Sequence, residues 1–310
     1  MTISDNIQKG IFNENTCLYS ENRIEIMKLR KYLPGKLGQI DPVIPVVRLQ
    51  GAIGAGGGPL SKTLSLAGVA GLLSKAFRDK EAPAVAISIN SPGGSPVQSR
   101  LIYTRIRELA EQHEKKVLVF VEDVAASGGY MLAIAGDEIF VDPTSIVGSI
   151  GVVSASFGFD KAIEKLGVER RVYTAGKNKV SLDPFQPEKK ADIAYLKELQ
   201  LEIHQVFIDM VKERRGEKLA DDADIFTGKF WTGIRAKDLG LVDEFGHMGT
   251  ILKQRFGEKV KMKLIQPKRG LFGRNSMGAG ITLGDQAISQ AVDSVVMTAE
   301  EKAMRARYGL

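Results

Sequence analysis

The chain of 310 residues is predicted to be an α/β protein with a largely parallel sheet. Short apolar runs bounded by glycine, proline or asparagine alternate along it with segments of helical periodicity. Because parallel strands need a crossover connection, usually a helix, this alternation favours a parallel sheet. The composition, 44% hydrophobic and 26% charged, is that of a globular protein.

The first half of the predicted core contains the clearest alternation. Strands are expected at 45–51, 84–90, 117–121 and 138–141, with helices at 66–77, from Ser95 onward, and up to Gly136. Ser95 is a suitable N-cap and Pro96 a suitable first helical residue. The helix that they open should bury one face, made of Val97, Leu101, Ile102, Ile106, Leu109 and Ala110.

In the second half of the chain, the alternation of predicted strands and helices is less regular. Strands are expected at 152–153 and 171–174, helices at 161–166 and 187–215, and a turn, short helix and turn over 231–243. A linker rich in glycine and serine over 275–284 leads to a final helix over 285–307. We therefore expect an N-terminal extension over 1–42, a central domain over 43–268, and a linker with a C-terminal helix over 269–310.

Composition also excludes several classes of function. The net charge of +6 is mild, and no basic stripe carries interleaved aromatics, so nucleic acid is not an expected partner. The single cysteine, Cys17, excludes a disulfide framework and a multi-cysteine metal cluster. The glycine-rich loop 54–58 misses the dinucleotide fingerprint, and no Walker sequence follows it. We expect no metal and no cofactor.

Membrane association is a separate question. The N-terminus lacks a charged region followed by an apolar one, and the longest uncharged stretch, 143–159, is too short and polar to span a bilayer. We expect a cytoplasmic protein. The basic run 253–274 is either solvated surface or a patch attracted to an acidic partner or an anionic membrane face.

Two glycine turns occupy equivalent places, each between a predicted strand and a predicted helix: Ser91-Pro-Gly-Gly94 and Ala126-Ser-Gly-Gly129. In open parallel sheets, ligands bind at that edge. Glycine there lets backbone N–H groups approach a ligand, and a serine beside them would lie next to oxyanion donors. The second turn is similar in placement to a nucleophile elbow, although it is not G-x-S-x-G. Taken alone, it is weak evidence for a nucleophile, and a purely structural turn is the more common case.

A nucleophilic serine needs a base. The three histidines, His113, His204 and His247, have no neighbourhood typical of a catalytic triad. A lysine can serve instead when desolvation lowers its pKa. The segment 174–185 offers Lys177 and Lys179, which from local pattern alone are loop lysines facing water.

Five motifs follow one another in a recognisable order. They are Ile89-Asn-Ser-Pro-Gly-Gly94, Val124-Ala-Ala-Ser-Gly-Gly-Tyr130, Pro143-Thr-Ser-Ile-Val-Gly-Ser-Ile-Gly-Val152, Gly176-Lys-Asn-Lys-Val-Ser-Leu-Asp-Pro-Phe185, and Phe226-Thr-Gly-Lys-Phe-Trp-Thr-Gly233 with Gly240-Leu-Val-Asp243. Together they resemble the signal peptide peptidase A family of serine peptidases, peptidase family S49, over about 45–265.

The resemblance implies a ClpP/crotonase-type spiral fold with repeated β-β-α units and a Ser–Lys dyad. Ser127 is then the nucleophile, Lys179 the general base and Lys177 its flanking residue. In this family a serine of the G-S-I-G motif hydrogen-bonds the basic lysine, which implies that role for Ser149.

The resemblance further implies an oxyanion hole formed by the N–H groups of Gly94 and Gly128. It implies peptide or unfolded-protein substrates and a homo-oligomeric ring, with the dyad within one protomer or shared between two. No membrane anchor of the kind found in membrane-bound members is expected, which leaves peripheral association with the inner membrane. The alternatives are a phage-type capsid-maturation protease, ClpP-like chemistry, an acyl-CoA-binding crotonase-like protein and a non-proteolytic scaffold.

Overall fold

The computed structural model describes residues 41–54, 63–266 and 301–310. Apart from residues 41 and 42, these belong to one compact unit, Val43–Leu310. Several predictions lie outside the described residues: Cys17, the extension up to residue 40, most of the loop 54–58, the linker 275–284 and the final helix up to residue 300. The last turns of that helix are described, and residues 301–306 are helical.

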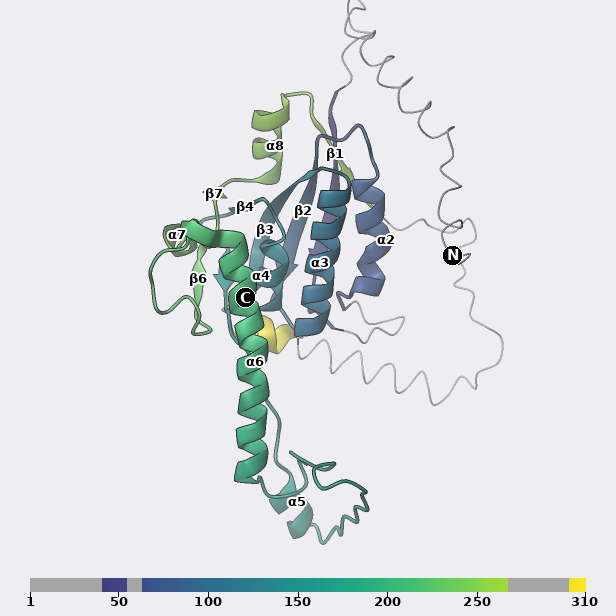
Figure 1. Ribbon diagram of the computed structural model, residues 1–310, viewed down its shortest axis with the longest axis vertical. Helices are drawn as coiled ribbons and strands as arrows, with labels where there is room; N and C mark the ends of the chain where they lie inside the picture. The colour runs from purple at the N-terminus through teal and green to yellow at the C-terminus, as the bar shows by residue number, and fades with distance from the viewer. Residues whose placement is uncertain (1–40, 55–62, 267–300) are drawn as a thin grey trace, which may run out of the picture. The chain divides into compact units, whose positions relative to one another are not determined.

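An eight-stranded sheet forms the centre of the unit (Figure 1). Its strands are β1 Val43–Gln50, β2 Ala84–Ser91, β3 Lys116–Ala126, β4 Glu138–Val141, β5 Ile146–Gly148, β6 Phe230–Thr232, β7 Glu244–Phe245 and β8 Lys261–Leu264. The main path runs β6-β5-β3-β2-β1-β8, with β4 beside β3 and β7 beside β4. All of these pairs are parallel except β5 with β6. The predicted α/β class with a largely parallel sheet is confirmed.

The helices of the unit are α2 Leu66–Phe77, α3 Pro96–Gln112, α4 Gly128–Ala133, α5 Asp160–Lys165, α6 Lys190–Arg215, α7 Gly233–Asp238 and α8 Met248–Phe256. One buried cluster joins α2, α3 and α4 to the sheet, and a second joins α8 to the opposite face. In the described ranges, no helix combines the length and the hydropathy that a bilayer span requires.

The helix that begins after Ser95 forms as predicted, because its signals are local. The Ser95 hydroxyl accepts a hydrogen bond from the N–H of Gln98 at 3.4 Å, and Pro96 is the first helical residue. Its predicted buried face was wrong at two positions. Val97 is 64% exposed and Leu101 is 40% exposed, whereas Ser99 is buried.

Two predicted strands were also wrong. Residues 152–153 and 171–174 form no strand, and they are exposed or half-exposed. The strand in this region lies earlier, at β5, where Ile146–Gly148 pairs with the end of β3. Runs of β-branched residues favour a strand only where a partner is within reach.

β3 pairs with different neighbours along its length. Residues Leu118–Phe120 pair with β4, and residues Val124–Ala126 pair with β5. β2 accompanies it on the other side, with a register shift between Ile89 and Ser91. The carboxyl ends of β2, β3 and β5 therefore meet at one edge of the sheet.

A buried ion pair fastens α6 to the segment before β7. Arg215, 4% exposed, contacts Asp243 through two bonds of 2.9 and 3.1 Å and donates to the carbonyl of Gly240. Lys218 donates to the same carboxylate at 2.7 Å. Burial opposes ionisation of Asp243, but these hydrogen bonds hold its pKa below the usual range.

We expect Asp243→Asn to destabilise the protein by about 3–5 kcal/mol, because the buried Arg215 loses its counter-charge. Asp222→Asn, in the exposed pair with Arg235, should cost at most about 1 kcal/mol. Urea unfolding at pH 7 measures both. Because the pKa of Asp243 is depressed by folding, its contribution is present above the unfolded value of about 4 and is lost as pH falls through the folded value. Equal unfolding midpoints for the two variants would contradict this assignment.

Candidate active site

Ser127 stands at a strained turn between β3 and α4. Its φ is 52° and its ψ −122°, a conformation that costs a non-glycine residue about 1–3 kcal/mol. Its N–H donates to the carbonyl of Gly148 at 2.8 Å, and its carbonyl accepts from Tyr130 at 2.9 Å. In the described part of the chain, its side chain makes no capping bond to α4. The hydroxyl is thus left for another role.

Glycine is required where the two predicted turns meet. A Cβ on Gly93, whose φ is 103°, would lie 2.8 Å from both the Cβ of Ser127 and the carbonyl oxygen of Ala126. A Cβ on Gly94, whose φ is 138°, would collide with the carbonyl of Ile53. The two turns that the sequence places at equivalent strand ends are therefore in direct contact.

Two backbone N–H groups at these turns, those of Gly94 and Gly128, lie outside the main-chain hydrogen bonds that join the turns. Ile53 donates to the carbonyl of Gly93 and accepts from the N–H of Ser95, both at 2.8 Å, which leaves the N–H of Gly94 outside this bridge. Gly128 is the first residue of α4, and the first N–H groups of a helix have no intrahelical acceptor. The structure thus brings Ser127 together with the two glycines that the resemblance assigns as oxyanion donors.

Ser149 lies at the same edge. It is 8% exposed with a φ of 55°, and its N–H donates to the carbonyl of Lys229 at 2.7 Å. It follows Gly148, whose carbonyl holds the N–H of Ser127. A Cβ on Gly148 would lie 2.7 Å from the indole of Trp231. One main-chain hydrogen bond therefore links Ser127 to Gly148, the residue directly before Ser149.

Lys179 and Lys177 lie elsewhere in the chain. Both belong to residues 152–189, here called the arm, in which every residue is exposed or half-exposed. Figure 1 shows α5, part of the arm, at the end of α6 that points away from the sheet. The N–H of Lys179 donates to the carbonyl of Gly176 at 3.2 Å, within a turn. The structure brings Ser127, Ser149, Gly94 and Gly128 together, and it does not bring Lys179 to them within one chain.

The arm has its own organisation. Arg170 pairs with Asp183 and stacks over the ring of Phe185 at 4.8 Å from its centroid. That ring lies 5.6 Å from the ring of Phe159. The backbone N–H of Phe185 and the guanidinium of Arg170 hold the pKa of Asp183 below its usual value. These contacts link both ends of the segment that carries Lys179.

The histidines make contacts away from Ser127. His204 on α6 lies 3.0 Å from the carbonyl of Ile150, His247 lies 3.8 Å from Asp142, and His113 follows the end of α3. Among the described contacts of Ser127, none involves a histidine.

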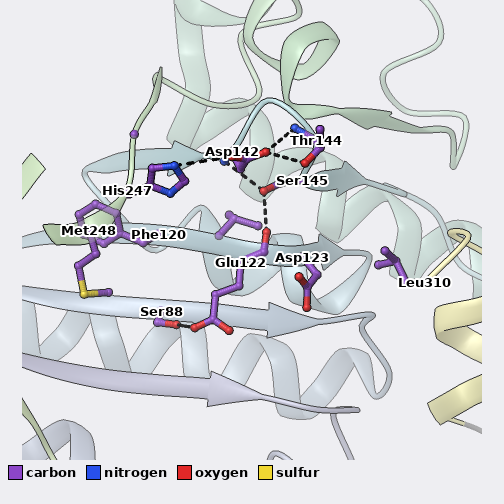
Figure 2. A pocket seen from close by; sticks show the side chains of 12 residues that line it. Ser88, Phe120, Glu122, Asp123, Asp142, Thr144, Ser145, His247, Met248 and Leu310 are labelled. Carbon is purple, nitrogen blue, oxygen red and sulfur yellow. Dashed lines mark hydrogen bonds and ion pairs between the residues drawn. The ribbon is translucent and has the colours of Figure 1, made fainter. Parts of the chain in front are cut away.

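A cavity of about 400 Å³, lined by both polar and apolar residues, lies beside this edge (Figure 2). Ser145 donates to the carbonyl of Glu122 at 2.6 Å, and Thr144 donates twice to Asp142. The bonds from Thr144 hold the pKa of Asp142 below its usual value. Burial opposes ionisation of Glu122, but bonds from Arg48 and Ser88 lower its pKa. Leu310, the last residue of the sequence, also lines this cavity.

Tyr308 was not among the site residues predicted from the sequence. Its hydroxyl donates to the Oγ of Ser149 at 3.2 Å, so it belongs to the surroundings of the site. No local pattern could have indicated this contact, because the two residues are 159 positions apart.

Comparisons with known proteins place the chain in a family. Residues 109–261 match Peptidase family S49. A protein of Methanocaldococcus jannaschii whose name describes it as a protease is 33% identical over 220 residues, which are 69% of this chain and 70% of that protein. Serine protease SPPA, chloroplastic, of Arabidopsis thaliana is 31% identical over 284 residues, 87% of this chain and 41% of that protein.

The largely parallel sheet and the family match support the ClpP-like fold, as predicted. The chain belongs to peptidase family S49.

Another relative carries a different name. The Na(+)/H(+) antiporter NhaA of Brucella abortus is 63% identical over 286 residues, which are 91% of this chain. The chain spans only 39% of the length of that protein. The antiporter name thus describes a whole protein of which this chain matches the smaller part, whereas the S49 match lies inside the chain itself.

We expect Gly94→Ala to destabilise the protein by roughly 2–4 kcal/mol, because the new Cβ would collide with Ile53 and strain the backbone. Gly71→Ala is the matched control. Gly71 lies in α2 with no atom within 4 Å of a built Cβ, so this variant should gain about 0.5–1 kcal/mol from helix propensity. Thermal unfolding compares them, and a Gly94→Ala protein as stable as the wild type would refute the close contact.

Proposed function

We propose that this chain is a serine endopeptidase that hydrolyses peptide bonds in unfolded or hydrophobic peptides, with Ser127 as nucleophile and Lys179 as general base. The observation that carries the proposal is the strained elbow at Ser127. Strain of this kind persists only where surrounding structure enforces it, and it concentrates at functional sites.

The reaction would proceed through an acyl-enzyme. The neutral amine of Lys179 takes the proton of the Ser127 hydroxyl as Oγ attacks the substrate carbonyl carbon. The N–H groups of Gly94 and Gly128 stabilise the oxyanion that forms, and losing one such donor typically costs about 10²–10³ in turnover. The lysine then gives its proton to the leaving amine, and water hydrolyses the ester by the same route. Ser149 orients the amine.

A second copy of this chain would supply the lysine. The arm exposes large apolar side chains, among them Phe157 at 80%, Leu166 at 77% and Tyr173 at 89%. On α6, Tyr195 is 59% exposed and Leu201 68%. Exposed apolar surface of this extent is typical of an interface between proteins. A ring in which each arm reaches the next protomer's Ser127 would cover these residues.

Burial at such an interface also serves the chemistry. An amine acts as a base only when it is neutral, and removal from water lowers the pKa of an amine. Assembly would therefore both deliver the lysine and create the dry surroundings that it needs. The cytoplasmic location, the attraction of the basic run 253–274 to a membrane surface, and the alternatives of capsid maturation, acyl-CoA binding or scaffolding stay predictions from the sequence.

We expect Ser127→Ala and Lys179→Ala each to lower the turnover of a fluorogenic peptide by at least about 10³-fold, because each removes one member of the dyad. Lys177→Ala, two positions away in the same arm, should retain most of the activity. A fluorophosphonate probe should label the wild type and not Ser127→Ala. Full turnover in either dyad variant would refute the assignment.

Co-expression of the two inactive variants tests whether the dyad is shared. If Ser127 of one protomer meets Lys179 of the next, random pairing restores about a quarter of the sites. If both belong to one protomer, the mixed oligomer stays inactive, because no protomer holds both residues.

The exposed apolar residues predict a dependence of assembly on the arm. Leu166→Asp combined with Leu201→Asp should give a smaller particle by native mass spectrometry, because the charges cannot be buried at an interface. Circular dichroism should stay unchanged, since neither side chain is in the core. Lys165→Asp is the matched charge control and should leave the mass unaltered. An unchanged mass in the double variant would show that these residues do not hold the subunits together.

A further inference from the structure

The turn that carries Gly94 begins with an irregularity in the pairing of β1 with β2. The register of the two strands, continued by one residue, places Gly51 opposite Ser91. The next pair along the chain is Ile53 with Gly94. One residue therefore lies between these two pairs on the β1 side, and two residues lie between them on the β2 side. The turn is a bulge with one extra residue.

This bulge leaves two main-chain groups without a partner in the ladder. In a regular parallel ladder, the carbonyl of Gly51 would accept from the residue after Ser91, but that residue is Pro92, which has no N–H. Among the main-chain hydrogen bonds of the described residues, none takes the N–H of Gly93. Buried main-chain groups of this kind destabilise a protein unless another group pairs with them.

The side chain of Ser91 pairs with both groups. Its hydroxyl donates to the carbonyl of Gly51 at 2.8 Å and accepts from the N–H of Gly93 at 3.3 Å. Ser91 is fully buried. A hydroxyl is both a donor and an acceptor, and here one function is used on each side of the bulge. The serine thus replaces the ladder bond that the proline cannot make.

Ser91 also contacts the helix that begins after Ser127. A Cβ on Gly129, in the first turn of α4, would lie 2.3 Å from the carbonyl oxygen of Ser91 and 3.3 Å from its Cβ. A Cβ on Gly93 would lie 2.9 Å from the backbone nitrogen of Gly128. The main chain that Ser91 supports is therefore packed directly against the start of α4.

We propose that Ser91 is a positioning residue of the active site, whose buried hydroxyl holds the bulge in the shape that presents the N–H of Gly94 to the oxyanion beside that of Gly128. This inference rests on the proposed function, because it takes these two glycines as the oxyanion donors. The hydroxyl does not meet the substrate, and it acts only through the main chain. Without it, the carbonyl of Gly51 and the N–H of Gly93 seek other partners, and the donor of Gly94 leaves its place.

Steady-state kinetics of full-length Ser91→Ala test this role. We expect kcat for a fluorogenic peptide to fall about tenfold to hundredfold, because a displacement of about 1 Å at a catalytic group can cost about 10²-fold. The effect is smaller than or equal to the loss of a whole donor. KM should stay within about twofold of the wild type, since Ser91 is enclosed. An unchanged kcat, with the wild type active, would overturn the proposal.

Ser145→Ala is the matched control for the loss of a buried hydroxyl. Ser145 is 2% exposed, and its hydroxyl likewise accepts from an N–H, that of Asp142 at 3.1 Å, and donates to a carbonyl, that of Glu122 at 2.6 Å. Both variants should unfold at similarly lowered urea concentrations, but only Ser91→Ala should lose kcat. An equal loss of kcat in both would show that the effect is general destabilisation and would overturn the proposal.

A transition-state analogue separates positioning from damage to substrate binding. A peptide boronate forms a tetrahedral adduct with a nucleophilic serine, so its affinity should fall in Ser91→Ala by the same factor as kcat/KM. The affinity for the uncleaved peptide, measured on Ser127→Ala with and without Ser91→Ala, should not change. An equal weakening of both ligands would contradict a role confined to the oxyanion donors.

Amide hydrogen exchange tests the support of the turn without any catalysis. Mass spectrometry of peptides covering residues 89–95 compares the wild type, Ser91→Ala and Ser145→Ala. Faster exchange in this turn for Ser91→Ala alone would support the role of its hydroxyl even if no variant hydrolyses peptides, in which case only the proposed function fails. Unchanged exchange in Ser91→Ala would overturn this inference even if the wild type is an active peptidase.

Discussion

The contact between the two glycine turns is the constraint on which the site depends. Gly93 at the end of β2 approaches Ser127 so closely that no side chain could stand between them. That approach is possible because β2 and β3 are paired in parallel and, after the register shift between Ile89 and Ser91, Ser91 lies opposite Ala125 at the sheet edge. The bond from Ser127 to Gly148 then ties β5 to the same point. The buried strands hold the positive φ of Ser127, which the local chain alone would not adopt.

The long third strand extends this constraint to Ser149. β3 pairs with β4 near its middle and with β5 at its end. Its last residues therefore lie beside β5, and Ser149 directly follows β5 in the sequence. β6 closes that side through Trp231, which fills the space above Gly148. Tyr130, in α4, is buried, and burial raises the pKa of its hydroxyl. This hydroxyl donates to the carbonyl of Leu241 at 2.7 Å. The turn at Ser127 is therefore supported by β5, by β6 and by the segment at Leu241, all of which are distant from it in sequence.

What could be predicted from the sequence follows from how local each signal is. α2 begins and ends at the predicted residues because capping by Ser65 and the apolar spacing are local. The glycine turns indicated the strand ends, whereas the roles of Ser127, Gly94 and Gly128 were implied by the family resemblance and stay predictions. β5 was predicted a few residues too late in the sequence. A strand of three residues carries little sequence pattern, and its position is set by its pairing with β3. The contact of Tyr308 with Ser149 depends wholly on tertiary packing, which no motif records.

The separation of Lys179 from Ser127 connects these features. The arm places its lysine on a surface with many exposed apolar side chains, whereas among the residues that the structure describes no base contacts the hydroxyl of Ser127. Ser149 already accepts a hydrogen bond from Tyr308 of the same chain. In the proposed function, the amine comes from a neighbouring copy, so its supply requires association. On that proposal, activity rises with protein concentration.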